Sequence, residues 1–259
     1  MVLINNVIAC LGGEDTTMEP RPIPKPGAGE ILLKLRCVGF CGTDLFKLTN
    51  NSAKPGMVLG HEIVGEVATL GKGINQFAIG DRIVVPHHVP CGSCHLCLRG
   101  NETMCETFRD NLMEPGGFAD HVLIHDRATA QAAQKVPDTV SDAAAVFMEP
   151  AACVLRGVNR ASLRPDGTAA VMGGGSMGLL HLLVIKAACP DAKVLLIDPA
   201  SNRCALAAEL GADKTAAPGD NALAAASSMT DGYGVDAVFD TVGGAPLLEA
   251  GLALSRQGG

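Results

Sequence analysis

The sequence contains very few aromatic residues and no concentration of positive charge. Among 259 residues there is no Trp and only one Tyr, so platforms for stacking nucleic-acid bases are scarce. The 20 basic residues are outnumbered by 27 acidic residues, which gives a net charge of −7, and no Lys/Arg cluster stands out. We therefore expect no nucleic-acid partner.

Long uninterrupted hydrophobic runs are also absent. Four glycines, His181 and Lys186 interrupt the most apolar stretch, residues 169–188, and the apolar N-terminal run has no basic residues before it. These features predict neither a membrane span nor a secretory signal, so we expect a cytoplasmic protein. In that reducing compartment, the ten cysteines are more suited to metal binding than to disulfides.

The sequence divides into two parts of different texture. Up to about residue 150, β-branched runs alternate with Gly and Pro, which predicts a compact antiparallel, barrel-like domain. From about residue 151 to 259, Ala- and Leu-rich helical segments alternate with short strands, which predicts βαβ units around a parallel sheet. The fold class is therefore α/β. The strands expected first are 30–38, 62–70, 82–86 and 118–124, then 168–172, 193–197 and 236–240, with a weaker strand at 214–217; the helices expected are 175–188, 200–210 and 245–255.

Four cysteines lie close together within residues 90–106. Cys91, Cys94, Cys97 and Cys105 form a C-x2-C-x2-C-x7-C pattern. Four thiolates in one loop can enclose a tetrahedral Zn²⁺ and leave no open position, which predicts a structural zinc site. The alternatives are buried or disulfide-bonded cysteines and an iron–sulfur cluster, although the familiar ferredoxin spacings differ from this one.

A glycine-rich turn follows the strand expected at residues 168–172. Gly173, Gly175 and Gly178 form G-x-G-x-x-G at the start of an apolar helix, with Ser176 and Met177 in its first turn. In a βαβ unit these glycines provide a tight turn, a close approach to a pyrophosphate and close helix–strand packing. The free N–H groups of the helix then face the phosphates, so we expect a dinucleotide cofactor.

Asp198 ends the next strand, 25 positions beyond Gly173. A carboxylate there suits the adenosine ribose and repels a 2′-phosphate, which favours NAD over NADP. Arg203 keeps NADP open, because a nearby arginine can meet that phosphate. The plain structural alternative is that Asp198 caps the following helix.

Three further segments suggest a second metal site. They are Cys41-Gly42-Thr43-Asp44, Gly60-His61-Glu62 and Met148-Glu149-Pro150. The string from Gly60 to Gly65, followed by Gly71 and Ile74, resembles the zinc-site signature of zinc-containing medium-chain alcohol dehydrogenases. The C-G-T-D string, the Gly80-Asp81-Arg82 turn and the four-cysteine loop match this family in order and spacing. Glutamate after the histidine, together with the later E-P, is most similar to its polyol, sorbitol and threonine dehydrogenase branch.

This resemblance implies a GroES-like β-barrel catalytic domain at residues 1–150 and a Rossmann doubly wound parallel-sheet domain at residues 151–259. It implies that Cys41 and His61 bind a catalytic zinc, with a carboxylate from Glu62 or Glu149. The wider enzyme class uses two cysteines and one histidine, so the carboxylate is inferred from the branch. Thr43 resembles the hydroxyl that passes the alcohol proton outward, and Asp44 the carboxylate that orients the zinc histidine. For Thr43 the structural alternative is an ordinary helix N-cap.

Two departures from the family accompany this resemblance. Many relatives carry a histidine where this chain has Phe46, which cannot carry a proton; Lys47 or a water chain is the alternative route. Relatives also continue beyond the helix at 245–255 into further strands, so the Rossmann domain is expected to be incomplete and the chain truncated at its C-terminus. The expected function is hydride transfer between NAD(P) and a secondary alcohol or polyol. The alternative is a catalytically silent zinc- and nucleotide-binding fragment, and the resemblance implies a homo-oligomer for complete relatives.

Overall fold

The computed structural model describes residues 3–259. The chain separates into two compact units, one ending at Glu149 and the other beginning at Pro150. We describe each unit by itself. No helix among residues 3–259 is long and apolar enough to cross a membrane.

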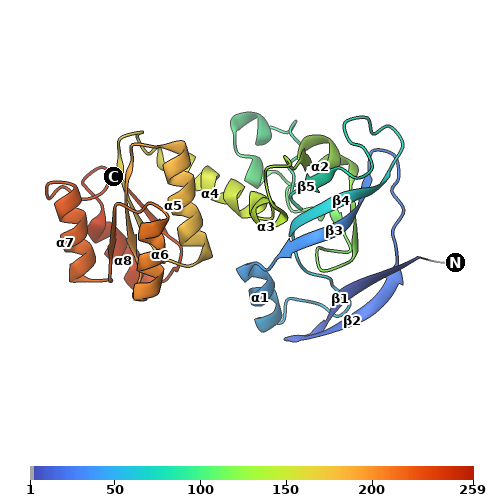
Figure 1. Cartoon of the computed structure of the whole chain (residues 1–259), viewed down its shortest axis with the longest axis horizontal. Coiled ribbons are helices and arrows are strands. Elements are labelled where there is room, and N and C mark those ends of the chain that lie inside the picture. Colours follow the sequence, from blue (N-terminus) through green and yellow to red (C-terminus); the bar gives the residue numbers. More distant parts are fainter. Residues whose placement is uncertain (1–2) are drawn as a thin grey trace. The chain divides into compact units, whose positions relative to one another are not determined.

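The N-terminal unit is built on an antiparallel sheet of six strands in the order β6-β7-β3-β4-β5-β8. A hairpin of β1 and β2 accompanies it (Figure 1). The strands are β1 (Ile4–Gly12), β2 (Asp15–Pro22), β3 (Ile31–Gly39), β4 (Glu62–Leu70), β5 (Arg82–Val84), β6 (Met113–Glu114), β7 (His121–Ile124) and β8 (Gln134–Lys135). Its helices are α1 (Gly42–Thr49), α2 (Asp126–Gln131) and α3 (Asp142–Ala145), and α4 (Met148–Ala161) runs from this unit into the next.

Alternation along these strands places one face in a continuous apolar core. Ile31 and Leu33 of β3, Val67 of β4, and Val122 and Ile124 of β7 are almost fully buried together. Side chains on a strand alternate between two faces, so this pattern fixes the register of β3 against its neighbours. In that register Gly39, the last residue of β3, pairs with Glu62, the first residue of β4.

The C-terminal unit contains a parallel sheet of four strands in the order β11-β10-β9-β12. The strands are β9 (Thr168–Met172), β10 (Lys193–Ile197), β11 (Lys214–Ala216) and β12 (Ala237–Asp240). The helices are α5 (Ser176–Ala188), α6 (Ser201–Glu209), α7 (Asp220–Met229) and α8 (Ala245–Leu254). Numbered from β9, this order is 3-2-1-4, which begins the dinucleotide-binding arrangement and confirms the expected Rossmann fold.

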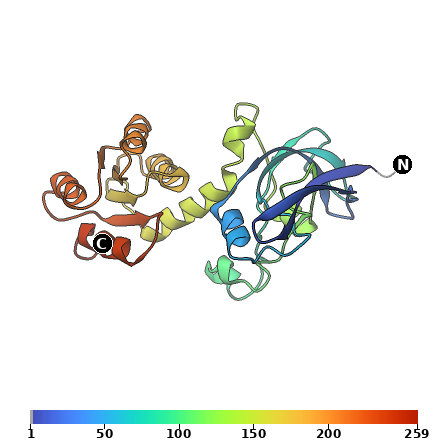
Figure 2. The same cartoon turned by 90° about the horizontal axis from the view of Figure 1, so that it is seen from below.

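Helices cover both faces of this sheet (Figures 1 and 2). On one face, Val171 of β9 packs with Leu182 of α5 and Ala207 of α6. On the other, Ala170 of β9 packs with Ala222 of α7 and Leu254 of α8. Successive residues of β9 therefore serve opposite layers, as the doubly wound fold requires.

The structure differs from the expected elements in several places. The hairpin of β1 and β2 and the helix α7 were not predicted, and the strands at residues 82–86 and 118–124 are shorter than expected.

The strand β12 lies at the edge of its sheet and pairs with β9 along its length. Just before it, Val235 forms a parallel bridge with Ser255, so this edge is covered where it begins.

Candidate functional site

The four cysteines of residues 90–106 meet in one loop. Their sulfur atoms all lie within 4.8 Å of one another. The Sγ atoms of Cys94 and Cys97 are 3.5 Å apart, and those of Cys91 and Cys97 are 3.9 Å apart. A zinc tetrahedron with Zn–S bonds of about 2.3 Å separates its sulfurs by about 3.8 Å. All four are free thiols, so the disulfide alternative does not describe this loop, and the donor set fits a closed metal site.

Glycines turn the backbone of this loop, and its N–H groups contact the cysteine sulfurs. Gly92 and Gly100 have φ angles of 74° and 73°, which only glycine adopts without strain. N–H groups of Ser93 and Cys94 donate to the Cys91 sulfur and lower the pKa of that thiol. Burial, together with the neighbouring thiol of Cys94, raises the pKa of Cys97. A bound cation would relieve this crowding of sulfur charge.

Cys41 is held at the start of a helix. It is the N-cap of α1, where its sulfur accepts the N–H of Thr43 at 3.5 Å. The carboxylate of Asp44 accepts the N–H of Cys41 at 3.1 Å, which completes a capping box. The capping residue is therefore Cys41, and Thr43, at the second helical position, is exposed with its hydroxyl free of the capping role.

His61 lies against the same carboxylate. Its Nδ1 is 3.5 Å from Oδ1 of Asp44, and that oxygen also accepts the N–H of Gly60 at 3.2 Å. Burial lowers the pKa of His61, but the hydrogen bond and charge of Asp44, with a smaller effect of Cys41, raise it to about 9. Burial raises the pKa of Asp44, but hydrogen bonds from His61 and from the backbone N–H groups of Gly60 and Cys41 keep it below its usual range. A zinc ion binds neutral imidazole, so metal binding would displace the proton and leave Asp44 to orient the ring.

Glu62 completes a three-residue donor group. One ligand atom each of Cys41, His61 and Glu62 lie within 4.8 Å of one another, and His61 and Glu62 are 8% and 9% exposed. The strand pairing explains this, because Gly39 leaves open the space that the Glu62 carboxylate occupies: a Cβ on Gly39 would stand 2.1 Å from Oε2. Glu149, in the first turn of α4, is not part of this group among residues 3–259.

A pair of histidines that the spacing did not single out lies beside this group. The rings of His61 and His87 are 4.5 Å apart between centroids, and those of His87 and His88 are 3.7 Å apart. Burial, followed by the charges of His88, His61 and Lys47, lowers the pKa of His87 to about 3. The signal available in the sequence was their position just after β5 and before the cysteine loop.

The glycine-rich turn has the geometry that a phosphate-binding loop needs. Gly173 has a φ of 100°, and a Cβ on Gly178 would stand 1.7 Å from the carbonyl oxygen of Gly173. By contrast, a Cβ on Gly175 would meet no atom within 4 Å, so this side of the loop is open. Gly175 is the N-cap of α5, and the exposed Ser176 and Met177 begin that helix.

Asp198 links the end of β10 to the glycine turn. Its Oδ2 accepts the N–H of Gly174 at 2.7 Å, and its Oδ1 accepts the N–H of Ala200 at 2.8 Å. Arg203 lies 3.3 Å from Oδ2. Burial opposes ionisation of Asp198, but these donors keep its pKa below the usual range. The N-cap of α6 is Ala200, so Asp198 is not the capping residue but a buried carboxylate, 3% exposed, that fixes the turn.

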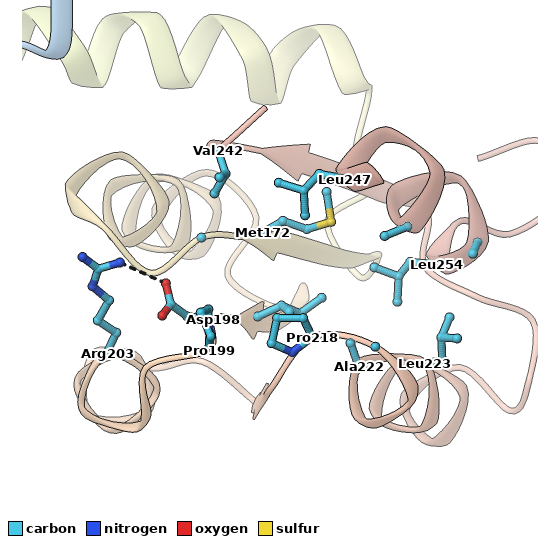
Figure 3. Close-up of a pocket in the computed structure, with 15 residues that line it drawn as sticks. Met172, Asp198, Pro199, Arg203, Pro218, Ala222, Leu223, Val242, Leu247 and Leu254 are labelled. Carbon is cyan, nitrogen blue, oxygen red and sulfur yellow. Dashed lines mark hydrogen bonds and ion pairs between the residues drawn. The ribbon is translucent and has the colours of Figure 1, made fainter. Parts of the chain in front are cut away.

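A cavity of about 380 Å³ opens beside Asp198. Figure 3 shows Asp198 and Arg203 at one end of the cavity and Leu223 and Leu254 at the other. Pro218, Val242 and Leu247 complete an apolar lining that suits a flat heterocycle such as adenine. The glycine motif predicted the turn. It did not predict that residues of α7 and α8 line the cavity, because only the fold brings them there.

Comparison with known proteins agrees with both halves of this description. Residues 27–138 match the family described as the alcohol dehydrogenase GroES-like domain. Residues 176–259 match the family described as zinc-binding dehydrogenase.

Two curated relatives and one solved structure resemble nearly the whole chain. Sorbitol dehydrogenase of Bacillus subtilis is 31% identical over 93% of this chain and 69% of its own length. L-threonine 3-dehydrogenase of Pyrococcus horikoshii is 31% identical over 89% of this chain and 66% of its own length. A zinc-binding dehydrogenase of Sinorhizobium meliloti, solved with NADP, is 30% identical with a TM-score of 0.86, over 99% of this chain and 75% of its own. The chain thus spans about two thirds of the length of the curated relatives.

The chain belongs to the zinc-containing alcohol dehydrogenase family. Its relatives include sorbitol and threonine dehydrogenases, which confirms the branch that the sequence resembled. The GroES-like and Rossmann folds expected from that resemblance are also confirmed. It is a zinc-binding dehydrogenase by sequence and by fold.

Proposed function

We propose that this chain transfers hydride between NAD and a secondary alcohol or polyol. The observation that carries the proposal is the convergence of Cys41, His61 and Glu62, whose ligand atoms meet within 4.8 Å, with His61 and Glu62 buried. One thiolate and one carboxylate balance the charge of Zn²⁺, and the imidazole supplies a neutral third donor. Zinc, when bound there, supplies a Lewis acid that favours loss of the alcohol proton near neutral pH.

The surrounding residues have separate tasks. Asp44 accepts N–H groups of Cys41 and Gly60 while facing His61, so it holds the imidazole ring in one orientation. The hydroxyl of Thr43, in the first turn of α1, receives the proton of the alcohol and passes it outward. Phe46 is 64% exposed and has no titratable group, so the proton leaves this helix by Lys47 or by water.

The cofactor binds to the other unit. Open backbone at Gly175 and the N–H groups at the start of α5 suit a pyrophosphate. The ionised Asp198 beside the apolar cavity suits the ribose hydroxyls of NAD and repels a 2′-phosphate. Arg203 is drawn to Asp198 at 3.3 Å, which favours NAD over NADP here.

Two further expectations concern the location of the protein and its assembly. All ten cysteines are free thiols, which is consistent with a cytoplasmic location. Leu248 and Leu252, which line one cavity on α8, are each more than 60% exposed, which favours association into a homo-oligomer.

Zinc content and turnover test the proposal together. We expect about two zinc ions per chain, falling to about one in Cys41→Ser, with NAD-dependent oxidation of secondary alcohols lost in that variant. Cys37→Ser, which removes a free thiol of β3, is the matched control and should keep both ions and activity. One zinc in both proteins without turnover would support the alternative of a catalytically silent zinc- and nucleotide-binding chain.

A further inference from the structure

A polar cavity lies beside the donor group of Cys41, His61 and Glu62. Its volume is about 430 Å³, and it is formed entirely by residues of the N-terminal unit. His61 forms part of the wall, so the cavity reaches the candidate metal centre. Besides His61, His87 and His88, the charged and polar side chains of the wall are Arg21, Asp44, Lys47, Arg109, Asn111 and Glu114.

Two cations of this wall have no carboxylate partner among residues 3–259. Lys47, on α1, is half-buried, and Arg109, in the segment after the cysteine loop, is exposed. Neither forms an ion pair with any carboxylate among residues 3–259, although nearby arginines do. Arg21, for example, lies 2.7 Å from Glu19 and also donates to the carbonyl oxygen of Gly56.

The acidic residues of the wall do not neutralise these cations. Asp44 is buried and already accepts two backbone N–H groups while facing His61. The side chain of Glu114 is 63% exposed and lies 3.9 Å from Nε2 of His125. The cavity therefore keeps two uncompensated positive charges next to the place where an alcohol would react.

One neutral side chain of the cavity wall adds a hydrogen-bond donor to these two cations. Burial lowers the pKa of His88, and the positive charges of Lys47, His61 and Arg109 lower it further. His88 lines the same cavity as both cations, and its neutral ring offers one N–H donor. The amide of Asn111 adds another donor to the same wall.

We propose that this cavity binds an oxyanion on the substrate, so that the preferred alcohol carries a carboxylate or phosphate group. This inference rests on the proposed function, because the same molecule would place its hydroxyl at the metal centre. Arginine presents a planar fork of donors that matches both kinds of oxyanion, and lysine adds a point charge. A neutral alcohol would leave both cations facing an uncharged ligand.

The binding arm uses the zinc-loaded full chain and needs no turnover. Inorganic phosphate and propionate are titrated separately by calorimetry into the wild type, Lys47→Gln and Arg109→Gln. We expect each variant to bind the preferred anion at least tenfold more weakly. Lys72→Gln and Arg160→Gln, which remove exposed cations outside the cavity, are the matched controls. Cys41→Ser should keep the binding, which separates the cavity from anions held on the metal.

The turnover arm compares three alcohols of one carbon chain: a hexitol, its terminal phosphate ester and the corresponding hexonic acid. We expect kcat/KM to be at least tenfold higher for one anionic alcohol than for the hexitol, and this advantage to disappear in Arg109→Gln. Which anion gains identifies the group as phosphate or carboxylate. Phosphate and propionate binding that is equal in the wild type and both variants would overturn the inference, as would a preference for the neutral hexitol.

Failure of the proposed function looks different. If none of the three alcohols is oxidised but phosphate or propionate binding falls in both cavity variants, the oxyanion site stands and hydride transfer does not. If the hexitol is oxidised fastest and anion binding is unaffected by the variants, hydride transfer stands and the oxyanion site does not.

Discussion

The carboxylate of Glu62 occupies space that only a glycine at position 39 leaves open. A Cβ on Gly39 would stand 2.1 Å from Oε2 and 3.0 Å from Cβ of Glu62. In Gly39→Ala the flexible carboxylate must move, while the β3–β4 pairing can remain. We therefore expect a folded protein whose zinc content falls from about two ions to about one per chain, measured by elemental mass spectrometry.

The matched control for this change is Gly157→Ala. Its added Cβ meets no atom within 4 Å, and the residue lies inside α4, where alanine is the better helix former. This variant should keep both zinc ions. Equal zinc content in the wild type and Gly39→Ala would show that the Glu62 carboxylate is not needed to hold the metal.

Substitution of two glycines in the dinucleotide turn should affect different properties, stability at one position and NAD binding at the other. In Gly178→Ala the new Cβ would stand 1.7 Å from a backbone oxygen, so we expect the free energy of unfolding to fall by about 3 kcal/mol or more. In Gly175→Ala the Cβ enters open space, so stability should stay within about 0.5 kcal/mol of the wild type. The same Cβ blocks approach of the pyrophosphate, and NAD should bind at least tenfold more weakly.

Urea unfolding and calorimetric titration with NAD distinguish these effects. Unchanged NAD affinity in a stable Gly175→Ala variant would place the pyrophosphate elsewhere. Stability of Gly178→Ala equal to that of Gly175→Ala would mean that α5 shifts away from β9 without cost.

The sequence predicted best those elements whose signals are local. The strand β4 occupies the expected residues 62–70, because glycines and polar residues bound its β-branched run on both sides. The strand β2 went unnoticed because it carries two prolines and little apolar alternation, and it exists through pairing with β1. The helix α7 is short and rich in Ala and Ser, so burial of Ala222 and Ala226 against the sheet determines it more than its own pattern does.

The same distinction applies to the site. The four cysteines lie within fifteen residues, so their spacing alone indicated a metal site. Cys41 and Glu62 come from different elements, so their spacing in the sequence did not indicate a shared site. The family resemblance predicted that they meet, and the pairing of Gly39 with Glu62 shows how the fold brings Glu62 close to Cys41. The cavity cations Lys47 and Arg109 are 62 positions apart and share no motif, so only the fold brings them to one wall.

The cysteine loop should lose its metal when one buried thiol is removed. In Cys97→Ser the closed set of four sulfurs loses one member, and the more weakly donating hydroxyl does not replace it. We expect about one zinc fewer per chain and faster proteolysis within residues 90–106. Cys189→Ser, which removes a buried free thiol outside the loop, is the control and should keep its zinc. Full zinc occupancy in Cys97→Ser would contradict a four-thiolate site.

An ion-pair network centred on Asp142 should make stability depend on pH. Its carboxylate lies 2.8 Å from both Arg36 and Arg82, and hydrogen bonds from these two arginines lower its pKa. Because the folded pKa lies below the unfolded one, the stabilisation is fully present above the usual aspartate pKa of about 3.9 and is lost as the pH falls through the folded pKa.

We therefore expect Asp142→Asn to reduce the free energy of unfolding by about 1 kcal/mol at pH 7, a modest value because Arg36 is 43% exposed. The difference from the wild type should stay constant between about pH 7 and 5 and shrink as the pH falls below about 4. Urea unfolding at a series of pH values measures it, with the exposed Asp138→Asn of the same segment as control. If the difference instead grew as the pH fell, protonation of Asp142 would stabilise the folded chain relative to its ionised form. The ion-pair network would then not be stabilising.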